Sequence, residues 1–220
     1  MGCTRCGILS CGGNCGRLNW LSSVCSIFPY AGRHRALLLA AKDIQNPLSI
    51  AIFNEAYSYV ATQVLAEILK KNHIQMVLLA RWRVQRLAAS QWHPNNFWVS
   101  CLEEAQRVVK KTDPGSAFEN MPALMFAAIT LKRRALIDAQ FRREKLDTEN
   151  ILIKDSICER FADSDSLNVL VLDDVLTSGG ALKREWTDLR AAMHGKCDVQ
   201  LHALTLFRTP AASFEEGNVN

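Results

Sequence analysis

The chain has 220 residues, of which 49% are hydrophobic and 22% charged, and this ordinary balance predicts a globular protein with a sizeable core. Its formal net charge of +4 permits contact with nucleic acid or a phosphorylated ligand without favouring either. No apolar stretch reaches the ~18 residues of a membrane-spanning helix, and the N-terminus lacks the apolar run of a secretory signal. We therefore expect a cytoplasmic protein with reduced thiols and no membrane insertion.

Cysteines concentrate at the N-terminus, where four of them surround a Gly-Gly bend. The spacing Cys3-x2-Cys6 followed by Cys11-x3-Cys15 suits two knuckles that hold one structural zinc ion in tetrahedral geometry. A disulfide framework is the main alternative, and the expected compartment disfavours it. Cys25 follows in an apolar segment; we expect it in a strand, although it could replace Cys11 or Cys15 as a zinc ligand.

The first half of the chain shows an apolar pattern that predicts alternating strands and helices. Residues 18–30 favour strand, residues 33–43 favour helix, residues 50–71 form a long amphipathic helix, and residues 75–80 form a short strand. In the long helix, apolar residues recur every three or four positions, which marks its apolar face as Ile52, Ala56, Tyr59, Val60, Val64 and Ile68.

The middle of the chain is less regular. Residues 81–97 are basic and rich in tryptophan, and we expect a loop with a turn at His93-Pro94-Asn95-Asn96. A helix over residues 97–111 and a β-compatible segment over 124–131 follow. The charged residues 132–150 are expected to form a mobile loop and then a helix, and Ile151-Leu152-Ile153 a short strand.

The run over residues 169–182 carries most of the functional information. Val169 to Leu172 predict a strand buried on both faces, and Asp173 and Asp174 stop it with two carboxylates at its C-terminal end. The turn Thr177-Ser178-Gly179-Gly180 then offers hydroxyls and unhindered N–H groups at the start of a helix. Because ligands of open α/β sheets bind at this edge, we expect a phosphate cradle beside carboxylates that hold sugar hydroxyls or a magnesium-bound pyrophosphate. The alternative is an ordinary strand–turn–helix junction with a solvated acidic pair.

The end of the chain completes the alternation. The helix after the Gly turn is expected to reach about His194, and a last strand covers Val199 to Phe207. This order of strands and helices predicts an α/β fold with a mostly parallel sheet and helices on both faces.

Residues 169–182 resemble the phosphoribosyl-pyrophosphate (PRPP) signature of type I phosphoribosyltransferases. Together with the cysteine knuckle and the pattern Tyr30-x-Gly32-x-x-Arg35-x-Leu37-x-x-x-x-Lys42, the chain resembles the ComF family (ComFC-like and GntX-like proteins). The resemblance implies an N-terminal zinc ribbon over residues 1–29, a type I phosphoribosyltransferase domain over 30–210 and a polar tail over 211–220. It also implies an association with DNA uptake during transformation.

The resemblance assigns roles to individual residues. Asp173 and Asp174 would contact the ribose hydroxyls of PRPP, whose pyrophosphate brings magnesium. The 5′-phosphate would be bound by Thr177, Ser178, Gly179, Gly180 and Ala181. Lys42, Asn96 and Gln140 are candidates for contacts to the pyrophosphate or to a closing loop.

The pyrophosphate half of the pattern departs from the family. His93-Pro94-Asn95-Asn96-Phe97 stands where many relatives carry Arg-Gly-Phe-Asn-Gln, and Pro94 has no N–H to donate. Glu149 occupies a place that is basic in relatives, where a carboxylate would repel pyrophosphate. The sequence therefore leaves open whether the protein is a phosphoribosyltransferase with turnover.

The alternative function is a catalytically inactive binding module that contacts single-stranded DNA or docks a helicase or translocase. Three tryptophans interleaved with arginines suit stacking on bases beside phosphate contacts, and partly buried packing is the other account of these tryptophans. The residues concerned are Trp82, Trp92 and Trp98 with Arg81, Arg83 and Arg86.

Overall fold

The computed structural model describes part of the chain, and several predicted features lie outside it. The described residues are 18, 20–79, 92–112, 125–127, 165–177, 179–193 and 197–209. The residues outside this set include the four proposed zinc ligands, Gln140 and Ser178. Residues 81–91 of the loop expected over 81–97, the segments expected over 132–153 and the tail over 211–220 are also outside it.

A single parallel sheet organises the described part of the chain. Its five strands are β1 (Ser23–Pro29), β2 (Met76–Leu79), β3 (Met125–Ala127), β4 (Ser166–Leu176) and β5 (Asp198–Arg208), in the order β1-β5-β4-β2-β3. Every pair of neighbours is parallel. The predicted α/β class is therefore confirmed. Residues 23–29, which the ComF resemblance includes in the zinc ribbon, form the strand beside β5 at one edge of the described sheet.

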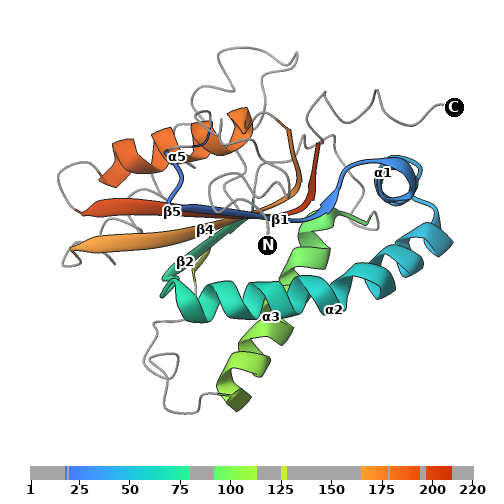
Figure 1. Ribbon diagram of the computed structural model, residues 1–220, viewed down its shortest axis with the longest axis horizontal. Helices are drawn as coiled ribbons and strands as arrows, with labels where there is room; N and C mark the ends of the chain where they lie inside the picture. The colour runs from blue at the N-terminus through green and yellow to red at the C-terminus, as the bar shows by residue number, and fades with distance from the viewer. Residues whose placement is uncertain are drawn as a thin grey trace, which may run out of the picture.

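Helices cover both faces of the sheet, as Figure 1 shows. The described helices are α1 (Gly32–Lys42), α2 (Pro47–Lys71), α3 (Pro94–Thr112) and α5 (Gly180–Met193). Side chains from α1, α2 and α3 share one core with Leu170 and Leu172 of β4, whereas α5 shares a second core with Val169 and Val171. None of the described helices is long and apolar enough to cross a membrane.

The strand β4 is buried on both faces, as its sequence predicts. Val169 to Leu172 are 0% exposed and alternate between the two cores. The expectation that Asp173 and Asp174 end the strand is wrong, because β5 continues to provide a partner and β4 runs on to Leu176. On the other side β2 ends where Leu79 pairs with Leu172, so the acidic pair lies just beyond the end of β2.

The long helix α2 buries a different stripe from the one that its periodicity marked. The buried side chains recur every four residues as Phe53, Tyr57, Ala61, Leu65 and Leu69. Ile52 and Tyr59 of the expected face are 44% and 73% exposed. Two adjacent stripes of α2 are apolar, and the aromatic one packs on Phe28 and Phe207 of the sheet.

Helix α3 begins earlier than predicted. The expected turn over 93–96 is wrong, because Pro94 occupies the first helical position and is buried. Proline suits this position, since its φ is helical and the missing N–H would have no partner within the helix. His93 becomes the residue that precedes the helix.

Candidate functional site

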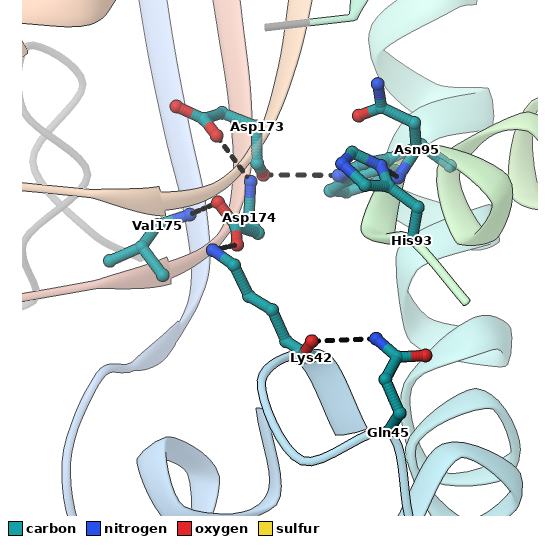
Figure 2. A network of polar contacts seen from close by, with 8 residues as sticks. Lys42, Gln45, His93, Asn95, Asp173, Asp174 and Val175 are labelled. Carbon is teal, nitrogen blue, oxygen red and sulfur yellow. Dashed lines mark hydrogen bonds and ion pairs between the residues drawn. The ribbon is translucent and has the colours of Figure 1, made fainter. Parts of the chain in front are cut away.

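The acidic pair of β4 meets a lysine from the first helix. Asp174 is 6% exposed, and its Oδ2 accepts a hydrogen bond from Lys42 Nζ at 2.7 Å. Lys42 is the last residue of α1, and Figure 2 shows its side chain extended toward Asp174. The structure therefore brings together three of the residues singled out from the sequence, Lys42, Asp173 and Asp174.

Gln45 ties the end of α1 to the segment that precedes α3. Its Nε2 donates to the carbonyl oxygens of Lys42 at 2.7 Å and Trp92 at 3.0 Å, and its Oε1 accepts from the N–H of Trp92 at 2.9 Å. The backbone of Gln45 has a φ of 58°, a left-handed conformation that is uncommon for residues other than glycine. These hydrogen bonds of Gln45 hold Lys42 and the start of α3 on the same side of the acidic pair. The sequence contains no local signal for them.

His93 completes the cluster at the N-terminus of α3. Its Nδ1 accepts the N–H of Asn95 at 3.0 Å, and its carbonyl accepts the N–H of Asn96 at 2.9 Å. Burial lowers the pKa of His93, while the charge of Asp174 raises it and that of Lys42 lowers it. Figure 2 shows the imidazole on the side of α3 that faces the acidic pair. His93 was not predicted as a site residue from the sequence. The signal that could have identified it as the cap is Pro94, because proline favours the first helical position.

Asp173 has a carboxyl group whose pKa is raised. Burial and then the charge of neighbouring Asp174 raise its pKa well above the usual range, whereas Lys42 acts in the opposite direction. Its Oδ1 accepts the N–H of Asp174 at 2.8 Å, and its carbonyl accepts from Trp98 Nε1 at 3.2 Å. The pair therefore combines a carboxyl group that is ion-paired with Lys42 and a second carboxyl group whose pKa is raised.

The Gly turn leads from β4 into α5 as the sequence predicts. Gly179 is buried and has a φ of 76°, and its carbonyl accepts the N–H of Lys183 at 2.9 Å. Helix α5 begins at Gly180 with no acidic residue in its first turn, while Thr177 is exposed. The positive end of the helix dipole and the backbone N–H groups there suit an anion. For Ala181, only its helical backbone belongs to the described part.

Asn96 and the tryptophans are the other residues predicted to contact a ligand. Asn96 is exposed in the first turn of α3 and lines a groove between α2 and α3. Trp98 is 1% exposed, and Trp92 packs on Phe53 with ring centroids 5.1 Å apart. The packing account therefore holds for both tryptophans, and the buried Trp98 cannot stack on a base. Trp82 and Arg81, Arg83 and Arg86 lie outside the described residues.

The described residues include His, Cys, Asp and Glu side chains, which are the usual metal ligands. None of their His, Cys, Asp and Glu side chains form a group of three or more that could hold a metal ion. Cys25 lies in β1, where its neighbour on β5 is Leu204, and burial raises the pKa of its thiol. The strand position expected for Cys25 is thus confirmed.

Comparisons with known proteins assign no family to this arrangement. The chain matches no family model, no curated protein and no solved structure.

Proposed function

We propose that the protein is phosphoribosyltransferase-like and binds PRPP, or a related phosphorylated sugar, with its magnesium at the carboxyl edge of β4. The observation that carries the proposal is the ion pair between Lys42 and Asp174 beside Asp173. Asp173 and Asp174 lie near the carboxyl end of β4, a few residues before the Gly turn at the start of α5, and open α/β sheets bind ligands at this edge. The ComF resemblance supports the same ligand class, together with a cytoplasmic role in DNA uptake and a zinc ribbon at the N-terminus.

Each part of the edge has a role in this proposal. Asp174 is ionised and accepts hydrogen bonds from ribose hydroxyls, and Asp173 accepts or donates according to its protonation. The backbone N–H groups from Gly179 to Ala181 bind the 5′-phosphate at the N-terminus of α5, and the hydroxyls of Thr177 and Ser178 add donors. Magnesium enters with the pyrophosphate of the ligand, because this ion keeps waters and phosphate oxygens as ligands.

Turnover is the further step of the proposal. A nucleophile would displace magnesium pyrophosphate from C1 of the ribose, through a transition state with oxocarbenium character. The chain would contribute by holding the sugar in the reactive position and by stabilising the developing charges. Lys42 and the candidate Gln140 are the groups proposed to face the pyrophosphate or a closing loop.

Isothermal titration calorimetry with PRPP and magnesium chloride tests the binding claim. We expect wild type to release heat, and the variant with Asp173→Asn and Asp174→Asn to lose most of the affinity. Asp198→Asn is the matched control, since Asp198 is exposed at the first residue of β5, at the opposite edge of the sheet. No heat from folded wild type at about millimolar ligand, a concentration that detects even weak binding, would contradict the proposal.

The binding module for single-stranded DNA or a helicase partner is the competing outcome. In that case wild type would give no heat with PRPP but would bind single-stranded DNA with an affinity that falls steeply with salt. Trp98 is buried and therefore unavailable to such a ligand. If PRPP does bind, pyrophosphate release in the presence of candidate bases separates a transferase from a binding protein.

A further inference from the structure

A groove of about 700 Å³ lies between α2 and α3, which cover the same face of the sheet (Figure 1). Apart from Trp92, its described lining residues fall between positions 54 and 63 of α2 and between positions 96 and 108 of α3. Each stretch is about three helical turns, or about 13 to 18 Å long. Lys42, Asp173 and Asp174 do not line the groove, so it is separate from the acidic pair.

The bottom of the groove is buried, and an exposed apolar stripe of α2 forms part of its wall. Phe97 and Cys101 of α3 are the buried residues. Tyr59 of α2 lines the groove and is 73% exposed, and Ile52 and Val60 are exposed on the same side of α2. The apolar stripe of a helix normally packs on another element, so an exposed stripe beside a groove indicates an interaction surface.

The charged residues among the described lining of the groove are both acidic. Glu55 comes from α2 and Glu104 from α3, and no described lysine, arginine or histidine lines the groove. Glu104 also pairs with Arg107 one turn along α3. That pair is exposed, so water screens it and Glu104 keeps most of its attraction for a second cation. Although the net charge of the chain is +4, this surface therefore attracts positive groups.

The α2 side of the groove also contains a hydrogen-bond acceptor without a donor. Asn54 lines the groove, and its Oδ1 is buried with no hydrogen-bond partner in the described structure. Buried polar atoms normally have such a partner. An occupant that brings N–H donors as well as positive charge would therefore suit this side of the groove.

The shape of the groove favours a helix as that occupant. Two packed helices leave a groove into which the side-chain ridges of a third helix fit. Three turns are long enough for the apolar residues of a helix at positions i, i+3, i+4 and i+7. Basic residues on both edges of this apolar face would meet Glu55 and Glu104.

We propose that the groove between α2 and α3 docks an amphipathic helix of a protein partner, with lysine or arginine residues on both edges of its apolar face. Apolar side chains of the partner helix pack on Tyr59, and its basic side chains pair with Glu55 and Glu104. Nucleic acid and anionic lipid do not suit this surface, because their phosphates would be repelled. The inference goes beyond the proposed function, since it uses none of the residues assigned to the phosphorylated sugar.

A dye-labelled model peptide of leucine and lysine tests the proposal by fluorescence anisotropy. The peptide has about fifteen residues, with leucine at every third or fourth position, so that its helix presents one apolar face. A peptide with glutamate in place of every lysine is the matched probe. We expect the lysine peptide to bind folded wild type at least about tenfold more tightly than the glutamate peptide. Equal affinities, or no binding of the lysine peptide, would overturn the proposal.

Two double variants test whether the peptide binds in this groove. Glu55→Gln with Glu104→Gln should weaken binding of the lysine peptide about tenfold, at about threefold for each exposed ion pair. Glu67→Gln with Glu103→Gln is the matched control, since both residues are exposed on the same two helices and neither lines the groove. The control changes the net charge equally and should bind as wild type does. Equal weakening in both variants would show that the peptide follows overall charge, which contradicts the proposal.

The apolar contact has its own matched pair. Tyr59→Ala should weaken binding of the lysine peptide about tenfold, as the loss of an aromatic anchor does. Ile44→Ala should have no effect, because Ile44 is 72% exposed but does not line the groove. Both variants should melt and bind PRPP as wild type does, so this inference and the proposed function can fail separately.

A second copy of the chain is the competing occupant. Sedimentation at increasing concentrations of wild type and Tyr59→Ala tests for it. We expect both proteins to sediment alike. A wild-type dimer that Tyr59→Ala abolishes would assign the groove to a second copy and overturn the proposal.

Discussion

Lys42 and Asp174 are separated by 132 positions in the chain, yet Nζ of the one lies 2.7 Å from Oδ2 of the other. The pair joins the end of α1 to the interior of β4, and the side chains are 21% and 7% exposed. An ion pair with so little solvent loses the attraction when one partner is removed but keeps the cost of burying the other. The same contact therefore holds α1 against β4 and also forms part of the candidate site.

Removal of the lysine charge should destabilise the fold. Lys42→Met leaves Asp174 buried without its cation, and we expect a loss of about 1–3 kcal/mol, below the usual cost for a fully buried pair because Lys42 is partly solvated. Lys70→Met is the control, since Lys70 is exposed in the last turn of α2. Urea unfolding of the two variants measures the difference. Equal midpoints would show that solvent already screens the pair.

Asp173 should make the protein less stable as the pH rises. Burial and the charge of Asp174 raise its pKa in the folded state, so the folded protein holds this proton more tightly than the unfolded chain does. The contribution of Asp173 to stability is then largest below the unfolded pKa near 3.8 and decreases as the pH rises through the folded pKa. Asp173→Asn removes this pH-dependent contribution. The stability of the variant relative to wild type should therefore increase as the pH rises from the unfolded pKa to the folded pKa of Asp173.

The measurement is the unfolding free energy of wild type and Asp173→Asn at a series of pH values. Asp198→Asn again serves as control, because the carboxyl of Asp198 is exposed. A constant difference between wild type and Asp173→Asn at every pH would show that Asp173 titrates alike in both states.

The elements that the sequence predicts well are those set by local pattern. Val169 to Leu172 form an unbroken apolar run, and such a run is required of a strand covered on both faces. The end of β4 was not predictable in this way, because its last residues pair with β5 and the partner strand decides how far the ladder extends. The face of α2 was mispredicted for a similar reason: Ile52 and Phe53 are both apolar, and only the aromatic cluster around Phe207 selects the second.

The residues of the candidate site also fall into two groups, those that a local pattern predicts and those that it does not. Lys42, Asp173 and Asp174 were found because their residue types and spacing resemble a known pattern. Gln45 and the indole of Trp98 act on backbone atoms that are distant in sequence, Gln45 on Trp92 and Trp98 on Asp173, and no pattern within one segment records such contacts.

The N-terminal cysteines provide a prediction that depends on the sequence alone. We expect about one zinc ion per chain in purified protein, lost on Cys3→Ser with Cys6→Ser, because a structural zinc site needs four ligands. Cys25→Ser should retain the metal, since Cys25 is half-buried in β1. Elemental analysis, together with a thiolate-sensitive zinc indicator, measures the zinc content of both variants. Loss of zinc in Cys25→Ser would make Cys25 a ligand in place of Cys11 or Cys15.

Gly179 should tolerate no side chain. Its φ of 76° is a conformation that L-residues rarely adopt, and a Cβ there would lie 2.6 Å from Cδ2 of Leu18. Gly179→Ala is expected to cost about 1–2 kcal/mol of stability and to weaken PRPP binding, because the turn must shift to relieve the contact. Gly32→Ala is the matched control: Gly32 has a φ of 48° but no atom within 4 Å of the added Cβ. It therefore measures the backbone cost alone. If both variants lose the same stability and Gly179→Ala binds PRPP as wild type does, the close approach to Leu18 does not shape the Gly turn.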